Sequence, residues 1–380
     1  MRELMRAHGF DALAFSQPDW FEWASNHPIR ELAWERPFLL VVTKDERSAA
    51  IIAEQSRGHV GAEQKRGALW IDSVAFYAEQ PSRNEATAET WSELAYDLLK
   101  AEGLDNARIG VDALSEPLRQ AARASEHLQL EAIPREALRA LRRVKHPDEI
   151  ATMEAAASLS DWAIGLYREE LRPGRLLAEV DYIVSAKLAR EAAERFPGED
   201  FSIGSLFSVA GPTSALPKGD GLSNGKRLEP NAVAVTTLAT RLNGLAMELA
   251  RPWIVGAPPQ RSIDYFKCAR DAQEASIDAA QVGRPVRAVH EAARTLIEAN
   301  GFGDFLRLRA GHGIGVVMHD FPEDMPFNSR PLVAGETYAI EPGLYVDGLG
   351  GFRFADVVAI GAEGAQRLTK ATKEISDLTI

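Results

Sequence analysis

The chain has 380 residues, 46% of them apolar and 26% charged, a composition typical of a folded globular protein rather than a disordered one. Its 43 basic and 55 acidic residues give a formal net charge of −12, which argues against nucleic acid or an anionic membrane as the main partner. The single cysteine, Cys268, excludes an internal disulfide and a zinc-finger spacing. No apolar run is long enough to span a membrane, and the N-terminus lacks the apolar core of a signal peptide, so we expect a cytoplasmic protein.

Hydrophobic patterning near the N-terminus predicts alternating strands and helices. Helices are predicted at residues 2–8 and 85–101, and strands at residues 12–15, 38–43, 49–53 and 108–112. An alternation of this kind predicts an α/β domain. At roughly 100–200 residues per domain, the length of the chain leaves room for a second domain.

The pattern changes near residue 143. Pro147 suits the first turn of a helix, and Asp148 and Glu149 suit the positive end of the helix dipole. Helices are predicted at residues 147–171, 179–196, 265–281 and 286–300, and strands at residues 201–209, 232–238, 245–255, 337–341 and 352–360. Strands separated by pairs of helices indicate an α+β domain. We therefore predict two domains, residues 1–142 and 143–380.

Four short segments of the second domain carry residues suited to catalysis or binding. They are a glycine-rich segment with His312 and the nearby His319, a Pro-Gly turn preceded by Glu341, an apolar strand with Glu248, and a glycine-rich loop with Lys218. Glycines beside a histidine let the backbone or a ligand approach closely. Taken singly, each segment also fits an ordinary structural role, such as a turn residue, a solvated strand face or a surface lysine.

The order of these segments resembles the pita-bread superfamily, which includes creatinase, aminopeptidase P, prolidase and methionine aminopeptidase. The resemblance extends from about residue 141 to the C-terminus and is most specific at VKHPDEI (144–150), GPTSALP (211–217), GHGIG (311–315), GETYAIEPG (335–343) and GFRFADV (351–357). Residues 1 to about 140 resemble the creatinase/prolidase-type N-terminal domain. The resemblance implies an α/β N-terminal domain followed by an α+β pita-bread domain. In that domain a curved antiparallel sheet, backed by two helix pairs, holds a site in its hollow.

The catalytic peptidases of this superfamily bind two divalent metal ions through two aspartates, one histidine and two glutamates. Carried over position by position, the histidine is His312 and the first glutamate is Glu341. The second aspartate falls on Glu248, which keeps a carboxylate on a side chain that is one methylene longer. The first aspartate falls on Thr237 and the last glutamate on Ala355, so two of the metal ligands are lost.

Two further positions carried over from the superfamily lie on the substrate side of the site. A histidine that follows a proline in these enzymes falls on Lys218, whereas a second histidine is kept as His319. Asp356 cannot replace the carboxylate lost at Ala355, because neighbouring residues of a strand face opposite sides. We expect Lys218 to supply the positive charge that metal ions supply elsewhere in the superfamily.

Counting charges and ligands argues against a dinuclear metal centre. Of the four carboxylates only Glu248 and Glu341 remain, so two divalent ions would leave a net charge of +2 before Lys218 is counted. His312 and these two carboxylates form a set that can hold one ion. We therefore predict no metal cofactor, with one divalent ion (Mn, Co or Zn) at Glu248, His312 and Glu341 as the alternative.

The resemblance implies a hydrolase that cleaves a C–N bond of a small metabolite without the usual dinuclear centre. Creatinase acts in this way on a guanidino compound, and ectoine hydrolase acts on a cyclic amidine. The general base that activates water would be one of the histidines, and the carboxylates would bind a cationic or amidine substrate. The candidate catalytic residues are His312, His319, Glu248 and Glu341, and the candidate substrate-binding residues, for a carboxylate or an oxyanion, are Lys218 and Arg353.

Two other interpretations stay open: a catalytically inactive binding module, and an aminopeptidase or prolidase with a single metal ion. Superfamily members that lack metal ligands can serve as interaction platforms. The expected partner in each case is a small-molecule substrate or ligand. The resemblance also implies a homodimer, and residues 18–34 offer Trp20, Trp23 and Trp34 as large apolar side chains for a subunit interface.

Overall fold

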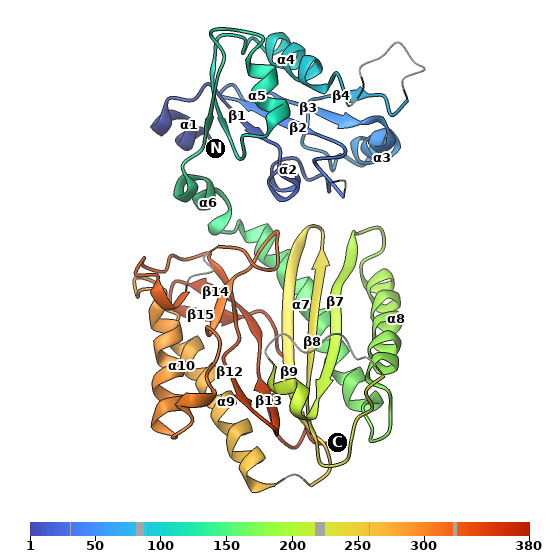
Figure 1. Cartoon of the computed structure of the whole chain (residues 1–380), viewed down its shortest axis with the longest axis vertical. Coiled ribbons are helices and arrows are strands. Elements are labelled where there is room, and N and C mark those ends of the chain that lie inside the picture. Colours follow the sequence, from blue (N-terminus) through green and yellow to red (C-terminus); the bar gives the residue numbers. More distant parts are fainter. Residues whose placement is uncertain (31, 81–86, 88, 217–224, 258, 322–324) are drawn as a thin grey trace. The chain divides into compact units, whose positions relative to one another are not determined.

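The computed structural model describes all residues except 31, 81–86, 88, 217–224, 258 and 322–324. The chain divides into two compact units, Met1–Arg142 and Arg143–Ile380. Figure 1 shows that each unit mixes helices with strands. In the described part of the chain, no helix is long and apolar enough to cross a membrane.

One sheet of six strands organises the first unit. The strands are β1 (Ala12–Phe15), β2 (Leu39–Thr43), β3 (Ser48–Ala53), β4 (Ser73–Tyr77), β5 (Arg108–Val111) and β6 (Gln129–Ala132). They follow the order β4-β3-β2-β1-β5-β6, in which β1, β2 and β3 pair antiparallel and the other neighbours pair in parallel. Parallel neighbours need a crossover connection, and a helix accordingly separates β3 from β4 and β5 from β6 along the chain.

Among the described residues, six helices belong to or border this unit. They are α1 (Arg2–His8), α2 (Pro18–Ser25), α3 (Arg57–Arg66), α4 (Trp91–Ala101), α5 (Glu116–Ala122) and α6 (Arg135–Arg143). The α/β architecture predicted for this domain is confirmed, although the helix predicted from residue 85 begins at Trp91. The sequence pattern missed α3, because that helix buries only Val60 and Glu63 and therefore has no apolar stripe.

The strands of the second unit form three small antiparallel sheets. The strands are β7 (Phe201–Ala210), β8 (Val233–Leu242), β9 (Leu245–Ile254), β10 (Gly311–Gly313), β11 (Thr337–Ile340), β12 (Gly343–Val346), β13 (Gly350–Arg353), β14 (Asp356–Gly361) and β15 (Gly364–Arg367). The sheets are β7-β8-β9, β10-β11-β14-β15 and β12-β13. A bridge between Ala250 and Ala355 joins β9 to the residues between β13 and β14.

Two helix pairs pack against these sheets, as Figure 1 shows. The helices are α7 (Pro147–Glu170), α8 (Leu177–Arg195), α9 (Gln260–Ala279) and α10 (Arg287–Ala299). The helix α8 packs on β7 and α7 on β8 and β9, whereas α9 packs on β11, β12 and β13 and carries α10. The pita-bread architecture expected from the sequence is therefore confirmed.

The segment predicted as one strand at residues 352–360 is divided between two sheets. β13 pairs with β12, and β14 pairs with β11. Gly351 in β13 has to be glycine, because a Cβ there would lie 2.1 Å from the carbonyl oxygen of Ser214. The division leaves Arg353 and Ala355 at the junction of the sheets.

Candidate active site

Five strands carry residues from distant parts of the second unit to one place. Thr237 lies in β8, Glu248 in β9 and His312 in β10. Glu341 directly follows β11, and Arg353 is the last residue of β13. The site therefore depends on strand register rather than on a single loop.

The strand register places Glu248, Thr237 and Ala355 on one face of the joined strands. These are one predicted metal-ligand position that keeps a carboxylate and two at which it is missing. Across β8 and β9, Ala239 is paired with Glu248 and Thr237 with Ala250. Ala250 is in turn bridged to Ala355. Because paired residues share a face and alternate residues along a strand do too, these five residues point to the same side.

The imidazole of His312 lies between two carboxylates. Its Nε2 is 3.4 Å from Oε2 of Glu248 and 3.5 Å from Oε1 of Glu341. All three side chains are buried. Gly311 lets β10 approach β11 this closely, because a Cβ there would lie 2.2 Å from the carbonyl oxygen of Ala339. The close backbone approach expected of this glycine-rich segment is thus confirmed.

The other ring nitrogen of His312 fixes how the ring faces the carboxylates. Nδ1 is 2.8 Å from the carbonyl oxygen of Gly313, so Nδ1 carries a proton and donates it. In the neutral ring, the Nε2 lone pair then faces the oxygens of Glu248 and Glu341. Nε2 of His312 and Oε2 of Glu248 have no hydrogen-bond partner among the described residues. Acceptors that converge in this way need a cation between them, either a proton or a metal ion.

The distances from His312 to the two carboxylates are close to those between two ligands of one divalent metal ion. Ligand atoms bound tetrahedrally at about 2.1 Å lie about 3.4 Å apart. The distances from His312 Nε2 to Glu248 and Glu341 are 3.4 and 3.5 Å. Ligand atoms of Glu248, His312 and His319 also lie within 4.8 Å of one another, a group that does not include Glu341. Glu248 and His312 therefore belong to two candidate ligand sets for one ion, with either Glu341 or His319 as the third member.

Electrostatics in the site distribute charge unequally over the two carboxylates. Burial raises the pKa of Glu341 and the charge of Glu248 raises it further, so that it stays above its usual range despite Arg353 and His312. Burial also acts to raise the pKa of Glu248, but His312 and Arg353 bring it below its usual value. Burial lowers the pKa of His312, whereas the two glutamates raise it and prevail. A proton between His312 and the carboxylates is thus stabilised when no metal is bound.

Arg353 contacts Thr237, one of the two positions at which the sequence resemblance predicts that a carboxylate is missing. Its Nη2 donates to Oγ1 of Thr237 over 2.6 Å, and its Nη1 is 3.5 Å from Oε2 of Glu341. Burial lowers the pKa of Arg353, but Tyr345 and Glu341 raise it above its usual value. The guanidinium therefore provides a permanent positive charge on this side of the site.

Asp356 faces away from the site, as strand alternation predicts. Its Oδ1 accepts from Nη2 of Arg251 at 2.8 Å, and its Oδ2 is 2.8 Å from Nζ of Lys373. Both Asp356 and Arg251 are fully buried. Burial acts to raise the pKa of Asp356, but the two cations lower it below its usual value. Asp356 therefore belongs to a buried ion-pair network and cannot replace the carboxylate lost at Ala355.

His319 forms the exposed edge of the site. Its ring stacks on that of His312, with the centroids 4.0 Å apart. Nη2 of Arg309 is 3.1 Å from Nδ1 of His319. Since a guanidinium can only donate, Nδ1 accepts, and the proton of the neutral ring is on Nε2. Sequence reasoning missed Arg309, although it lies just before the glycine-rich segment of His312.

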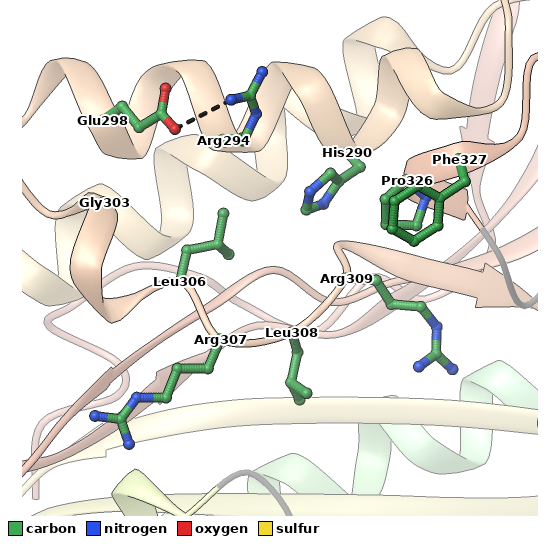
Figure 2. A pocket seen from close by; sticks show the side chains of 10 residues that line it. All are labelled: His290, Arg294, Glu298, Gly303, Leu306, Arg307, Leu308, Arg309, Pro326 and Phe327. Atoms are coloured by element: carbon green, nitrogen blue, oxygen red, sulfur yellow. Dashed lines mark hydrogen bonds and ion pairs between the residues drawn. The ribbon is translucent and has the colours of Figure 1, made fainter.

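Arg309 also links the site to a pocket of about 480 Å³. Figure 2 shows residues of α10, among them His290 and Arg294, on one side of this pocket and the segment 303–309 on the other. Two further arginines of the pocket form ion pairs, Arg294 with Glu298 and Arg307 with Asp347. The side chain of Arg309 extends away from His290 and Phe327 in Figure 2. The charges of Arg294 and Arg307 are thus balanced by carboxylates, and Arg309 is the arginine of the pocket that contacts His319.

Lys218 falls within residues 217–224, outside the described part of the chain. Its expected role as a source of positive charge stays a prediction. Among the described residues, Arg353 and Arg309 both carry charges that lower the pKa of Glu341.

Comparisons with known proteins agree with this architecture. The Creatinase/Prolidase N-terminal domain family matches residues 1–144, and Metallopeptidase family M24 matches residues 151–362. A Xaa-Pro dipeptidase of Pyrococcus furiosus is 32% identical over 235 residues, which are 62% of this chain and 65% of that protein. The chain thus matches a little under two thirds of that relative. A Xaa-Pro dipeptidase of Lactobacillus helveticus is 28% identical over 63% of each chain.

The solved structures show the same fold over the whole chain. The prolidase from Pyrococcus furiosus has a TM-score of 0.78 at 23% identity, covering 98% of this chain and all of that one. The X-Pro aminopeptidase from Thermotoga maritima has a TM-score of 0.82 at 18% identity, covering 100% of this chain and 98% of its own. With M24 matched over more than half of its length, this chain belongs to metallopeptidase family M24 and carries a creatinase/prolidase N-terminal domain.

Proposed function

We propose that this chain hydrolyses a C–N bond in a small, carboxylate-bearing substrate, a dipeptide or a metabolite of similar size, without a dinuclear metal centre. The observation that carries the proposal is the pair of buried carboxylates on His312 Nε2, at 3.4 and 3.5 Å, beside a guanidinium bound to Thr237. Family membership and the relatives named Xaa-Pro dipeptidase support amide hydrolysis as the chemistry.

Glu248, His312 and Glu341 would hold one divalent ion, of the Mn, Co or Zn type considered from the sequence. Such an ion polarises a scissile carbonyl and makes water more acidic. A second ion is disfavoured by charge, because Arg353 already stands against Thr237 and Glu341. Two carboxylates and one guanidinium sum to −1; one divalent ion brings the total to +1, and two bring it to +3.

The side chains themselves suggest a division of roles. Glu341, whose pKa is raised by burial, is the best placed proton acceptor for water. His319 carries its neutral-ring proton on Nε2 and can donate it as a hydrogen bond to a developing oxyanion. Both histidines are weaker candidates for the general base. His312 Nε2 is held between carboxylates, and Nδ1 of His319 already accepts from Arg309.

Arg309 would bind the carboxylate of the substrate. It stands between the pocket and His319, where a bound carboxylate would lie close to the catalytic groups. A guanidinium binds a carboxylate with two parallel hydrogen bonds, which orients the substrate as well as attracting it. The small volume of the pocket favours a dipeptide-sized molecule over a long peptide.

A binding module without turnover is the second candidate. The observation that favours it is the contact of Arg353 with Thr237 and Glu341, which fills one side of the site with a protein side chain. In that case the carboxylates would bind a cationic ligand and no bond would be broken.

The test combines metal counting with an activity panel of dipeptides, including Xaa-Pro, and small amides and amidines, with chelator and with Mn²⁺, Co²⁺ or Zn²⁺. We expect turnover of at least one carboxylate-bearing compound. We also expect the parent to bind at most one metal equivalent more than the Glu248→Gln variant. Two equivalents lost in that variant would contradict the mononuclear site. Tight binding without turnover across the panel would support the binding module.

A matched variant tests whether the missing ligands matter. Thr237→Asp combined with Ala355→Glu restores both carboxylates, and we expect it to raise the metal content of the site by about one equivalent. The homodimer expected from the resemblance stays a prediction, and light scattering at micromolar concentration tests it.

A further inference from the structure

Two histidines and a glutamate of the first unit form a cluster that has no part in the candidate active site. His27 follows α2, and its preceding residue Asn26 ends that helix in a left-handed conformation. His59 and Glu63 lie four residues apart on α3, so that their side chains share one face of the helix. The cluster therefore joins a loop to a helix that is distant in sequence.

The donor atoms of this cluster converge on both oxygens of one carboxylate. Nδ1 of His27 is 2.5 Å from Oε2 of Glu63, and Nε2 of His59 is 3.6 Å from Oε1 of the same residue. One ligand atom from each of the three residues lies within 4.8 Å of the others. His27 and Glu63 are 1% and 5% exposed at their side chains, whereas His59 is 54% exposed.

The buried histidine is held in place by its surroundings. Its backbone N–H donates to Oγ of Ser25 over 3.1 Å, and that hydroxyl donates to the carbonyl oxygen of Phe21. The ring of Phe21 meets the His27 imidazole edge to face, with the centroids 6.4 Å apart. The ring of His59 meets it from another side at 5.5 Å. A ligand fixed in this way loses little conformational entropy when it binds an ion.

A hydrogen bond between His27 and Glu63 explains the burial of those two residues. It does not explain why His59, free to point into solvent, directs Nε2 at the second oxygen of a carboxylate that already has a partner. Two imidazoles and one carboxylate are the protein ligands of one common class of zinc site, which leaves a fourth position for water. Nitrogen and oxygen donors of this kind also suit Co²⁺ and Ni²⁺.

We propose that His27, His59 and Glu63 bind a divalent transition-metal ion of the zinc type. Zinc bonds of about 2.1 Å place neighbouring ligand atoms about 3.4 Å apart. The distance from His59 to Glu63 already has this value within about 0.2 Å, and the contact of His27 with Glu63 has to lengthen by about 1 Å. The ion takes the place of the proton that lies between His27 Nδ1 and Glu63, and the neutral imidazole then carries its one proton on Nε2. The exposed His59 leaves a route by which the ion enters and water completes its coordination.

The test is titration of the metal-free full chain with Zn²⁺, followed by calorimetry and elemental analysis. The central variant is His59→Asn, because its side chain is more than half exposed and its replacement leaves the core intact. We expect it to bind one zinc equivalent fewer than the parent, or to bind that equivalent at least about tenfold more weakly. Glu248→Gln, which alters the candidate active site, should retain this equivalent.

Co²⁺ provides a second readout. The parent and Glu248→Gln should show the visible absorption of low-coordinate Co²⁺ with nitrogen and oxygen ligands, and His59→Asn should lose that part of the spectrum. The hydrolytic activity of His59→Asn should equal that of the parent, which separates this site from the one in the second unit. Equal zinc stoichiometry and affinity in the parent and His59→Asn would overturn the proposal.

Discussion

The two sides of the candidate active site use opposite means to balance negative charge. On one side, Glu248, His312 and Glu341 converge on a point that a proton or one metal ion can occupy. On the other side, Thr237 and Ala355 offer no carboxylate, and Arg353 donates to Thr237. Arg353 thus brings a permanent positive charge to the side with fewer carboxylates, and we expect this charge to take the place of a second ion.

The largest expected effect lies on the side that keeps its ligands. Glu341→Gln removes the proposed proton acceptor while preserving shape, and we expect kcat/KM to fall by at least about 10²-fold. Steady-state kinetics on the substrate found in the panel measures this. The matched control is Glu363→Gln, which removes an exposed carboxylate from the turn between β14 and β15 and should leave kcat/KM unchanged. Similar rates in both variants would remove Glu341 from the mechanism.

The next effect lies on the altered side. Arg353→Met leaves Glu341 without its guanidinium partner, and we expect the free energy of unfolding to fall by about 3 kcal/mol, as for other buried charges that lose a partner. Urea unfolding in the presence of chelator measures it. Adding Glu341→Gln should recover part of the loss, which a double-mutant cycle quantifies. A loss within about 0.5 kcal/mol would mean that Arg353 is not the balancing charge.

Asp112 of the first unit is a buried carboxylate whose hydrogen-bond partners carry no charge. It can therefore be compared with Glu341, which lies beside the charged Arg353. It accepts hydrogen bonds from Ser16, Gln17 and Ala113, with oxygens 2.7–3.0 Å from the backbone nitrogens. Burial raises its pKa to about 6, against the opposite pull of these hydrogen bonds. A raised carboxyl pKa means that the folded state binds the proton more tightly, so stability is lost as the pH rises from about 4 to about 6.

The expected contribution of Asp112 is about 3 kcal/mol over that window, from about two pKa units at 1.36 kcal/mol each. Asp112→Asn should abolish this part of the pH dependence, whatever its effect on stability at a single pH. Tryptophan fluorescence during urea unfolding at pH 4 and pH 7 is a suitable probe, since most of the tryptophans lie in residues 1–142. A parent and variant with parallel pH profiles would show that Asp112 is ionised throughout.

The smallest expected effect concerns the pocket beside His319. Arg309→Met should raise KM at least about tenfold with a smaller change in kcat, because a charge-assisted hydrogen bond to the substrate carboxylate is lost. Arg294→Met is the control from the same pocket, since Arg294 is already paired with Glu298. Equal KM values in the two variants would place substrate recognition elsewhere.

Much of the second unit could be predicted from the sequence, for identifiable reasons. The helices α7 and α8 and the strand β9 have long apolar stripes, and Pro147 with the Glu149 side chain on the His146 backbone marks where α7 begins. The glycine-rich segment around His312 is recognisable in the sequence, and Gly311 stands there because only glycine fits against the Ala339 carbonyl. The helix and strand patterns can be read from short stretches of sequence, whereas the contact of Gly311 with Ala339 depends on strand pairing.

Other features depend on contacts that the linear order hides. The hydrogen bond from Arg353 to Thr237 joins residues 116 positions apart that lie in two different sheets. Arg309 gave no signal, because one arginine in an exposed segment looks like any other. The division of residues 352–360 between β13 and β14 depends on which partner strands lie nearby, while the apolar pattern runs through the break.

The guanidinium of Arg353 is part of the polypeptide, whereas a metal ion has to be taken up from solution. It is present in every folded copy of the chain, however scarce manganese, cobalt or zinc becomes, and no chelator can withdraw it. Its effect on Glu341 is therefore independent of metal supply. When metal is scarce, the positive charge of Arg353 is retained, whereas a site that takes its positive charge from two metal ions would lose both ions.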